Sequence, residues 1–260
     1  MKFELLISSV NQTPEKLLET MKVNSDAVIV NQASEDSTKD IEFQQHKVKV
    51  ITQSQRGVGL SRNTALDNSN ADICLFGDED IVYNADYESK VIAGFENYPD
   101  ASVLTFNVQV DERRRTYFNE DVHRIKWNNY GRYPAYAIAV KRRDILDKNI
   151  RYSLLFGGGA KYSNGEDSLF LHDCLKAGLI MYSQTDCIGS ETYRQSTWFE
   201  GYTDKFFFDR GVLYHFLYGK AACVFGARFL LKNKDTMLKG RTFKDAFALL
   251  RAGVHEGKSL

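Results

Sequence analysis

The chain has 260 residues, and its 34 Lys and Arg side chains balance 34 Asp and Glu, so the formal net charge is zero. This length fits one large domain, or a domain with a small appendage. A neutral chain gives no support to binding of nucleic acid or another polyanion, and a hydrophobic content of 43% argues against disorder.

Short apolar runs alternate with helix-like segments along the first half of the sequence. Thr13 and Pro14 are typical of the start of a helix, and Pro99 lies just beyond the end of another. We expect strands at residues 3–10, 27–30, 48–52, 72–77 and 102–110, and helices at residues 14–23, 61–68 and 86–97. This alternation predicts an α/β fold with a mixed, mainly parallel sheet flanked by helices.

The second half is less regular and ends in a basic segment. We expect a strand at residues 136–140, a glycine-rich loop at 156–160, and helices at 166–177, 211–231 and 243–252. From Gly219 onward, Lys and Arg outnumber Asp and Glu. The C-terminal helices either pack on the preceding domain or lie at an anionic membrane surface. No apolar run reaches the roughly 18 to 20 residues that span a bilayer.

Three consecutive acids, Asp78, Glu79 and Asp80, follow the expected strand at residues 72–77. Ligands of open α/β sheets bind beyond the carboxyl ends of the strands. Carboxylates one residue apart at such an edge can hold Mg²⁺ or Mn²⁺, which would bridge to phosphate oxygens. The alternative interpretation is a solvated acidic turn.

The segment from Gly57 to Asn63, Gly-Val-Gly-Leu-Ser-Arg-Asn, precedes and opens an expected helix. Glycines allow close approach of the backbone, and a helix N-terminus offers free N–H groups to an anion. Arg62 could pair with a phosphate or hold an acid of the triplet. The segment lacks the full dinucleotide or P-loop fingerprint, so an ordinary capped turn is the alternative.

Glu166 and Asp167 begin another expected helix, directly after Gly165. Acids in the first turn suit the helix dipole, and one of them could instead act as a general base. The glycines just upstream, Gly158 and Gly159, would let an acceptor substrate approach.

Aromatic side chains are the other candidates for the acceptor site. Trp127 lies in a polar, aromatic stretch at residues 113–133, and Trp198 lies in Ser-Thr-Trp-Phe. Such rings can stack on sugar rings, and partly buried packing is the alternative.

Taken in order, these segments resemble the family 2 glycosyltransferases of the GT-A fold, of the type found in bacterial polysaccharide biosynthesis. The resemblance covers about residues 3–210. Its most specific parts are the Gly-Leu-Ser-Arg-Asn segment and the Gly-Glu-Asp segment taken as a pair. The segments that carry it are residues 8–11, 31–32, 57–63, 76–80, 165–167 and 196–199.

The resemblance implies a role for each of these segments. Asp167 matches the catalytic base of inverting members, with Glu166 beside it, and Asp78 and Asp80 match the acids that bind the metal, Mg²⁺ or Mn²⁺. A His that completes the metal shell in many relatives is absent, and Glu191 is the candidate in its place. The residues implied to bind the nucleotide sugar are Ser8, Val10, Gln32, Gly57, Arg62, Asn63 and Asp78.

Gln32 departs from the pattern, because relatives usually offer an acid to the base at that position. An amide can still hydrogen-bond a uracil edge. The resemblance implies a nucleoside-diphosphate sugar, UDP-linked, as the donor, and a hydroxyl of a glycan or of a lipid-linked molecule as the acceptor.

The expected organisation is a catalytic domain at residues 1–210, with a nucleotide-binding half (1–110) and an acceptor half (111–210), followed by a basic helical extension at 211–260.

The four cysteines have no metal-ligand spacing and suit reduced thiols in a cytoplasmic protein. Contact with the inner membrane face would run through residues 212–260. Two alternatives remain: an enzyme that forms sugar nucleotides, and a non-catalytic sugar-binding relative.

Overall fold

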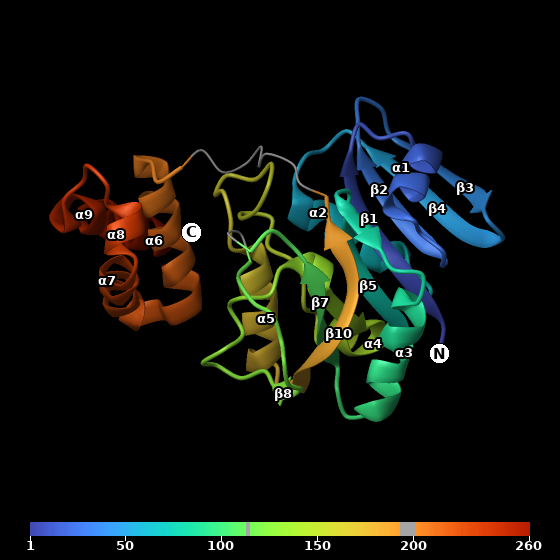
Figure 1. Ribbon diagram of the computed structural model, residues 1–260. Helices are drawn as coiled ribbons and strands as arrows, with labels where there is room; N and C mark the ends of the chain where they lie inside the picture. Colours follow the sequence, from blue (N-terminus) through green and yellow to red (C-terminus); the bar gives the residue numbers. More distant parts are fainter. Residues whose placement is uncertain (113–114, 193–200) are drawn as a thin grey trace. The chain divides into compact units, whose positions relative to one another are not determined.

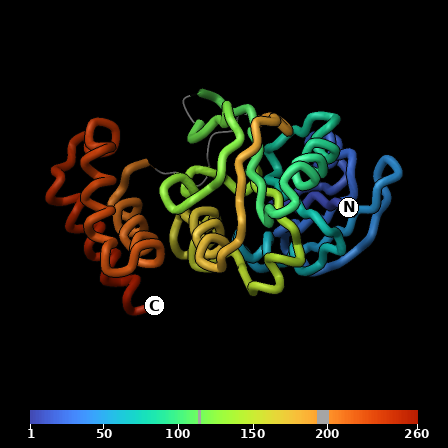
Figure 2. Tube along the Cα trace, turned by 90° about the horizontal axis from the view of Figure 1, so that it is seen from below, coloured from blue at the N-terminus to red at the C-terminus, as the bar shows by residue number. Residues whose placement is uncertain are grey.

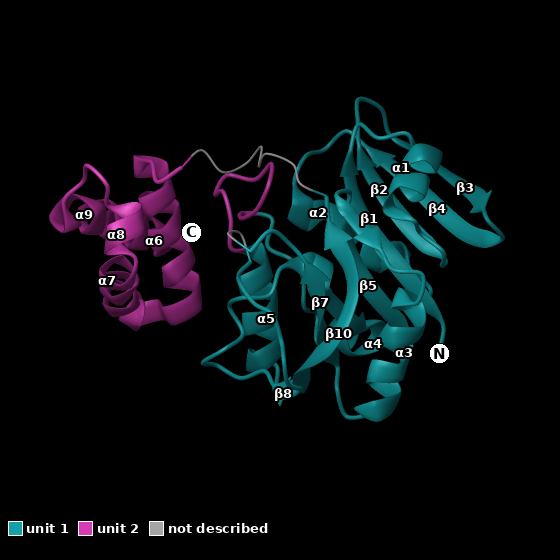
Figure 3. Cartoon of the chain, viewed as in Figure 1, with its two compact units in different colours: residues 1–154, 166–195 teal, residues 155–165, 196–260 magenta. Residues whose placement is uncertain are grey.

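The computed structural model describes residues 1–112, 115–192 and 201–260. The chain divides into two compact units, one of residues 1–154 and 166–195, the other of residues 155–165 and 196–260 (Figure 3). The second unit thus combines the C-terminal region with a short internal segment that directly precedes Glu166.

A mixed sheet forms the body of the first unit (Figure 1). Within its described residues the strand order is β3-β4-β2-β1-β5-β9-β7-β10-β6, and β8 pairs with β10. The strands are β1 (Phe3–Val10), β2 (Ala27–Gln32), β3 (Ser37–Phe43), β4 (His46–Gln53), β5 (Ile73–Asp78), β6 (Ile81–Tyr83), β7 (Val103–Gln109), β8 (His123–Arg124), β9 (Ile138–Lys141) and β10 (Met181–Glu191). The helices are α1 (Pro14–Met21), α2 (Val58–Asn68), α3 (Tyr87–Asn97), α4 (Arg142–Asp147) and α5 (Glu166–Lys176), with a 3₁₀ turn, η1 (Ala135–Ala137).

The expected mainly parallel sheet flanked by helices is confirmed. Strand β1 pairs in parallel with β2 and β5, β2 pairs in parallel with β4, and β7 pairs in parallel with β10. Strand β9 runs antiparallel between β5 and β7. The carboxyl ends of β1, β2, β4 and β5 therefore lie along one edge, where α/β sheets bind ligands.

Alternation along the strands assigns each side chain to one face of the sheet. Leu5 and Ile7 of β1 pack in the core that α1 and α3 complete with Leu18 and Val91. The intervening residues of β1 point to the other face, which α2 covers. On that second face Phe76 of β5 meets Phe170 of α5, with their ring centroids 5.7 Å apart.

Strand β3 was not expected from the sequence, and its hairpin with β4 shows why. Most residues of β3 are exposed and polar, so the sequence shows no apolar run at this position. The turn uses Gln44 and Gln45 with φ of 50° and 70°. Two-residue hairpin turns with positive φ normally carry Asn-Gly or Asp-Gly, and this pair has no such signature.

The second unit is helical, and its helices, orange to red in Figure 2, pack side by side. They are α6 (Asp204–Tyr218), the 3₁₀ turn η2 (Gly219–Ala221), α7 (Ala222–Lys232), α8 (Lys234–Met237) and α9 (Phe243–Gly257). A Cβ on Gly211 of α6 would lie 2.0 Å from the Leu250 carbonyl oxygen, and one on Gly253 of α9 would lie 1.9 Å from that of Phe208. Glycine at both positions thus permits the close contact of α6 with α9.

The expected single helix at residues 211–231 is wrong. Helix α6 begins at Asp204 and ends at Tyr218. The next residue, Gly219, interrupts the helix with a φ of 52°, a conformation that favours glycine. The expected boundary after residue 210 therefore falls inside α6. Among the described residues, no helix has both the length and the apolarity to cross a bilayer.

Candidate active site

Ser8, Gln32 and Asp78 lie at the carboxyl ends of three neighbouring parallel strands. Ser8 of β1 is opposite Asp78 of β5 in the register, and Val10 is opposite Gln32 of β2. Because Ile7 packs in the core with α1 and α3, Ser8 points to the face that α2 covers. The Ser8 Oγ is buried and has no hydrogen-bond partner among the described residues, so it can bond a ligand.

Arg62 of α2 brings together acids that are far apart in the sequence. Its Nη2 lies 3.0 Å from Asp78 Oδ1, and its Nη1 lies 2.9 Å from Asp167 Oδ1 and 3.2 Å from Glu166 Oε1. Only 3% of the Arg62 side chain is exposed. Three carboxylates therefore surround one buried guanidinium, and the acids from β5 and α5 share a single site.

The start of α2 determines where Arg62 points. Gly57 has a φ of 134° and precedes the helix as its N-cap. A Cβ on Gly59 would lie 2.3 Å from the Ser153 carbonyl oxygen, so this turn of α2 sits directly against the chain at residue 153. Asn63 fixes the same contact, because its amide donates to the Tyr152 carbonyl (2.9 Å) and accepts from the Tyr152 N–H (2.8 Å). Asn63, expected in the nucleotide site, thus binds backbone with both ends of its amide.

An aromatic platform supports the guanidinium. The Arg62 Cζ lies 5.1 Å from the centre of the Tyr152 ring. Tyr152 stacks on Phe170, with centroids 4.3 Å apart and planes 6° from parallel, and meets the edge of Phe76. The rings fill the space beneath Arg62, and a guanidinium over an aromatic face is itself favourable.

Burial and neighbouring charges shift the pKa values of Asp167 and Arg62 strongly. Burial raises the pKa of Asp167 to about 8, and repulsion from Glu166 adds to the shift, while Arg62 opposes it. Burial would lower the pKa of Arg62, but the carboxylates of Asp78 and Asp167 outweigh it and raise the pKa above its usual value. Asp167 is therefore a carboxyl with a raised proton affinity beside a permanent cation.

Residues of η1 complete the site, and sequence reasoning missed them. The Ala135 N–H donates a hydrogen bond to Asp167. Burial raises the pKa of Tyr136 above its ordinary range, and four carboxylates, those of Glu191, Asp78, Asp80 and Asp167, raise it further. These four carboxylates therefore all act electrostatically on Tyr136. Neither residue belongs to a recognisable motif. The turn η1 directly precedes the antiparallel strand β9, and this strand brings it to the site.

Three hydrogen bonds that involve the backbone tie the strand ends together. The Gln32 Oε1 accepts from the Gly57 N–H at 2.7 Å, and Arg56 Nη1 donates to the Gln32 carbonyl at 3.1 Å. The Val10 N–H donates to Glu79 Oε2 at 2.9 Å. Gln32 thus holds the glycine loop onto β2, while Glu79 joins the ends of β1 and β5.

The acids suit a divalent cation by their chemistry rather than by a preformed cage. Within residues 1–112, 115–192 and 201–260, no three His, Cys, Asp or Glu side chains form a group that could hold a metal ion. Asp78, Asp80 and Glu191 all act on the Tyr136 hydroxyl, and carboxylate oxygens suit Mg²⁺ or Mn²⁺. Mg²⁺ usually keeps several waters and takes phosphate oxygens as further ligands, so one or two of these carboxylates would be enough to hold such an ion.

The expected acceptor residues belong to different parts of the chain. Trp127 is exposed, and its ring lies 5.3 Å from that of His172, further along α5 than Asp167. Gly158 and Gly159 belong to the segment 155–165 of the second unit. Trp198 lies outside the described residues.

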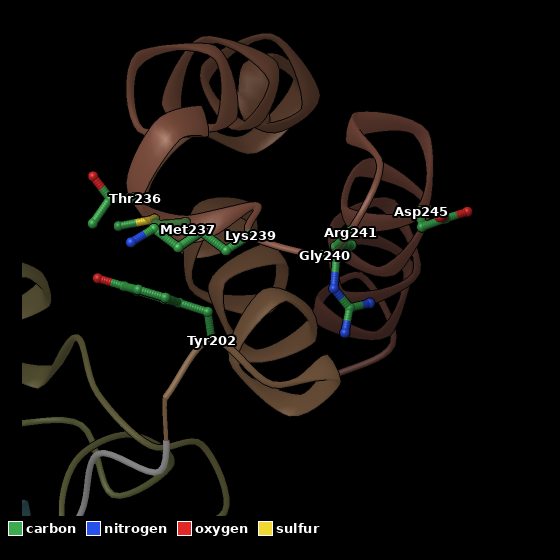
Figure 4. Close-up of a pocket in the computed structure, with 7 residues that line it drawn as sticks. All are labelled: Tyr202, Thr236, Met237, Lys239, Gly240, Arg241 and Asp245. Atoms are coloured by element: carbon green, nitrogen blue, oxygen red, sulfur yellow. The ribbon is translucent and has the colours of Figure 1, made fainter.

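A pocket of about 620 Å³ in the second unit contains none of the expected site residues (Figure 4). Among its lining residues, Arg241 forms an ion pair with Asp204 and lies against the Phe207 ring at 5.3 Å. The Asp245 carboxylate accepts from Thr242 at the start of α9. These contacts serve the packing of the helices.

Solved glycosyltransferase structures share this architecture. TarS of S. aureus (residues 1-349), solved with UDP-GlcNAc, superposes with a TM-score of 0.63 at 16% identity, over 91% of this chain and 73% of that one. A mannosyltransferase of Pyrobaculum calidifontis, solved with GDP-Man and Mn²⁺, gives 0.54 at 13% identity, over 99% and 87%. At these identities the likeness shows the fold, which is the GT-A fold. The search of curated proteins gave no match.

The fold therefore defines the architecture of this protein, which is that of the GT-A fold. The sequence model described as glycosyl transferase family 2 matches residues 7–150, more than half of the chain. The chain belongs to this family, and the match spans β1 to β9 with Arg62 and Asp78.

Proposed function

We propose that this protein transfers a sugar from a nucleoside-diphosphate donor, UDP-linked, to a hydroxyl of a glycan or lipid-linked acceptor, with inversion at the anomeric carbon. One observation carries the proposal. Asp78, at the carboxyl end of β5, and Asp167, at the start of α5, bind the same buried guanidinium. An acid placed for the diphosphate and an acid placed as base therefore belong to one site.

Asp167 is the general base. It removes the proton of the acceptor hydroxyl while that oxygen bonds to the anomeric carbon. The bond from this carbon to the phosphate oxygen breaks on the opposite face, and the nucleoside diphosphate leaves with the electron pair. The deprotonated form of Asp167 acts as the base, and a pKa raised to about 8 gives that form a high proton affinity. A general base works best when its pKa lies near the working pH.

Arg62 and Ala135 hold this base in place. The guanidinium and the Ala135 N–H both donate to the Asp167 carboxylate, which fixes its orientation before an acceptor arrives. Glu166, on the same guanidinium, repels Asp167 and helps to keep its proton affinity high.

Asp78 and Asp80, with Glu191, would hold Mg²⁺ or Mn²⁺. Such an ion supplies Lewis-acid stabilisation of the charge that develops on the leaving diphosphate. The Ser8 hydroxyl and the end of β1 would bind the nucleoside, because they face the same side of the sheet as Asp78.

A donor screen tests this proposal. UDP and GDP sugars, including UDP-GlcNAc and GDP-Man, are tested with Mg²⁺ or Mn²⁺ for thermal shift and for nucleotide release. A donor that both stabilises the protein and releases nucleoside diphosphate supports it. Pyrophosphate release from a nucleoside triphosphate and a sugar phosphate would instead identify a nucleotidyltransferase. Calorimetry with UDP and Mn²⁺ that gives no heat, together with no turnover, would identify a non-catalytic relative.

The second unit offers a surface for peripheral contact with an anionic membrane, where lipid-linked acceptors reside. Val224 and Leu231 of α7 are 72% and 60% exposed, and Arg228 and Lys232 line the same shallow hollow. An apolar helix face with basic neighbours suits anionic headgroups. By contrast, Val212 and Leu213 of α6 are buried.

Vesicle flotation tests this contact. The double variant Val224→Ser with Leu231→Ser is compared with the unaltered protein on phosphatidylcholine vesicles with and without phosphatidylserine. We expect the unaltered protein to float only with phosphatidylserine, and the variant to remain behind. Leu154→Ser is the matched control, because Leu154 is also 60% exposed. Equal recovery of all proteins in the soluble fraction would remove the membrane contact.

A further inference from the structure

The segment 155–165, which contains three consecutive glycines, groups with the C-terminal helices rather than with the sheet. It ends at Gly165, and the next residues are Glu166 and Asp167. The last residue of this segment is therefore one peptide bond away from Glu166.

Asp209 of α6 is the main attachment point. Its Oδ2 accepts from both the N–H and the hydroxyl of Ser163, each at 2.9 Å, and from Lys205 Nζ at 2.6 Å. Lys205 also donates to the Lys161 carbonyl at 3.0 Å. Asp209 is only 4% exposed. A buried carboxylate with three donors forms strong, charge-assisted hydrogen bonds.

Residues on the same face of α6 continue the attachment. Leu213 is one turn beyond Asp209, and a Cβ on Gly165 would lie 2.5 Å from its Cδ2. Gly165 has a φ of 118°, so glycine is required there for its backbone as well. Further along, Phe216 meets the edge of the Phe156 ring at 5.7 Å. The spacing of these helix residues places them in one row.

Helix α9 provides a second attachment through Glu256. Its Oε1 accepts from Lys161 Nζ at 2.9 Å and from the Tyr162 hydroxyl at 3.1 Å. The Tyr162 ring is buried. Two helices that pack closely on each other thus hold adjacent residues of one short, glycine-rich segment.

We propose that Asp209 is a positioning residue for the catalytic base, and that the helical unit acts as a clasp on the segment 155–165. This inference rests on the proposed function of Asp167. A free segment with Gly157, Gly158 and Gly159 would sample many backbone conformations. The clasp restricts them and fixes where the chain enters α5, which keeps Asp167 oriented toward an acceptor. Small misplacements of a catalytic group are costly to the rate.

Asp209→Ala in the full-length protein tests the clasp, with hydrogen exchange as the first measurement. We expect exchange of the Ser163 amide and of residues 155–165 to rise by about tenfold or more, and exchange in the first turn of α5 to rise with it. Asp209→Asn, which keeps one acceptor oxygen, should restore part of the protection. Ser163→Ala removes only one hydrogen bond, so it provides a milder variant if Asp209→Ala fails to fold.

Kinetics are the second measurement. With the donor that the screen identifies, we expect kcat for transfer to fall by about tenfold to a hundredfold, with calorimetric binding of UDP and Mn²⁺ unchanged. Asp245→Ala is the matched control, because this acid lies in the same unit and its carboxylate binds Thr242 at the start of α9. It should leave kcat and the exchange of 155–165 unchanged.

The outcomes separate the clasp from the proposed function. Unaltered exchange in Asp209→Ala, or a loosened segment with an unaffected first turn of α5, would overturn the clasp. An equal loss of kcat in Asp245→Ala would also overturn it, since that points to general destabilisation. An unaltered protein that turns over no donor contradicts the proposed function instead, and the exchange measurement still decides the structural claim.

Discussion

Asp78 and Asp167 share one hydrogen-bond partner, the guanidinium of Arg62, although one ends a central strand and the other lies in the first turn of a helix in the second half of the chain. With Glu166, three carboxylates surround a single buried cation. The acids therefore keep more negative charge than Arg62 neutralises. This excess of negative charge would favour the binding of a divalent cation.

Removal of the Arg62 charge should destabilise the fold. In Arg62→Met, three partly buried acidic side chains lose their shared partner. Breaking a buried ion pair from one side costs about 3–5 kcal/mol, so we expect a loss of this order in the free energy of unfolding. Urea denaturation at neutral pH measures it.

Arg143→Met is the control for this prediction. Its pair with Asp147 has both side chains exposed, at 89% and 65%, and exposed pairs contribute little. We expect its unfolding curve to overlay that of the unaltered protein. Equal stability of Arg62→Met and Arg143→Met would show that the carboxylates do not depend on Arg62.

The close contact between Gly59 of α2 and the backbone of Ser153 leaves no room for a side chain at position 59. Gly59→Ala would place a Cβ 2.3 Å from the Ser153 carbonyl oxygen. Overpacking of this kind costs about 1–3 kcal/mol, and it would also displace Arg62. Thermal unfolding should show a lower Tm than Gly131→Ala, where the nearest atom lies 3.9 Å from the added Cβ. A Gly59→Ala protein as stable as Gly131→Ala would contradict the geometry.

The raised pKa of Asp167 predicts how stability depends on pH. Its ordinary pKa is 3.8, and its folded pKa is about 8. Between these values the folded state keeps a proton that the unfolded state has lost, so this group's contribution to stability falls as pH rises. The slope approaches about 1.4 kcal/mol per pH unit at most.

Asp167→Asn removes this titration. The stability of the unaltered protein relative to the Asn variant should therefore fall from about pH 4 to pH 8, measured by urea denaturation at several pH values. A difference that stays constant, or that grows with pH, would show that the folded-state pKa of Asp167 is not raised.

The proposed role of Asp80 as a metal ligand predicts how turnover depends on Mn²⁺. In Asp80→Ala we expect turnover to require a higher concentration of Mn²⁺, because one carboxylate ligand is lost while Asp78 remains. A chelator should abolish turnover in the unaltered protein, and added Mn²⁺ should restore it. Asp86→Ala, which alters an exposed acid paired with Lys90, is the control. Turnover that resists the chelator would exclude a metal role for these acids.

Much of the fold could be predicted from apolar runs and helix starts, because buried parallel strands such as β1, β2 and β5 consist largely of such runs. The edge strand β3 could not, since its side chains face solvent. The long expected helix at 211–231 was wrong because Gly219 ends α6, and a single glycine within an amphipathic pattern does not reveal its φ.

The candidate site could likewise be predicted only in part. Arg62, Asp78 and Asp167 were recognisable because their residue types follow strand ends and helix starts. Ala135 and Tyr136 were not, since an antiparallel strand brings them to the acids. The amide of Asn63 could be recognised as a possible ligand contact, but the fold shows that the backbone of Tyr152 already binds both of its ends.

The most direct test of the shared site compares Asp78→Asn with Asp167→Asn, using calorimetry with UDP and Mn²⁺ beside nucleotide release from an active donor. We predict that Asp167→Asn binds UDP like the unaltered protein and loses about 10²- to 10⁴-fold in kcat, the usual contribution of a general base. Asp78→Asn should lose the Mn²⁺-dependent binding itself. Transfer by Asp167→Asn at the unaltered rate, or undiminished binding by Asp78→Asn, would contradict the account.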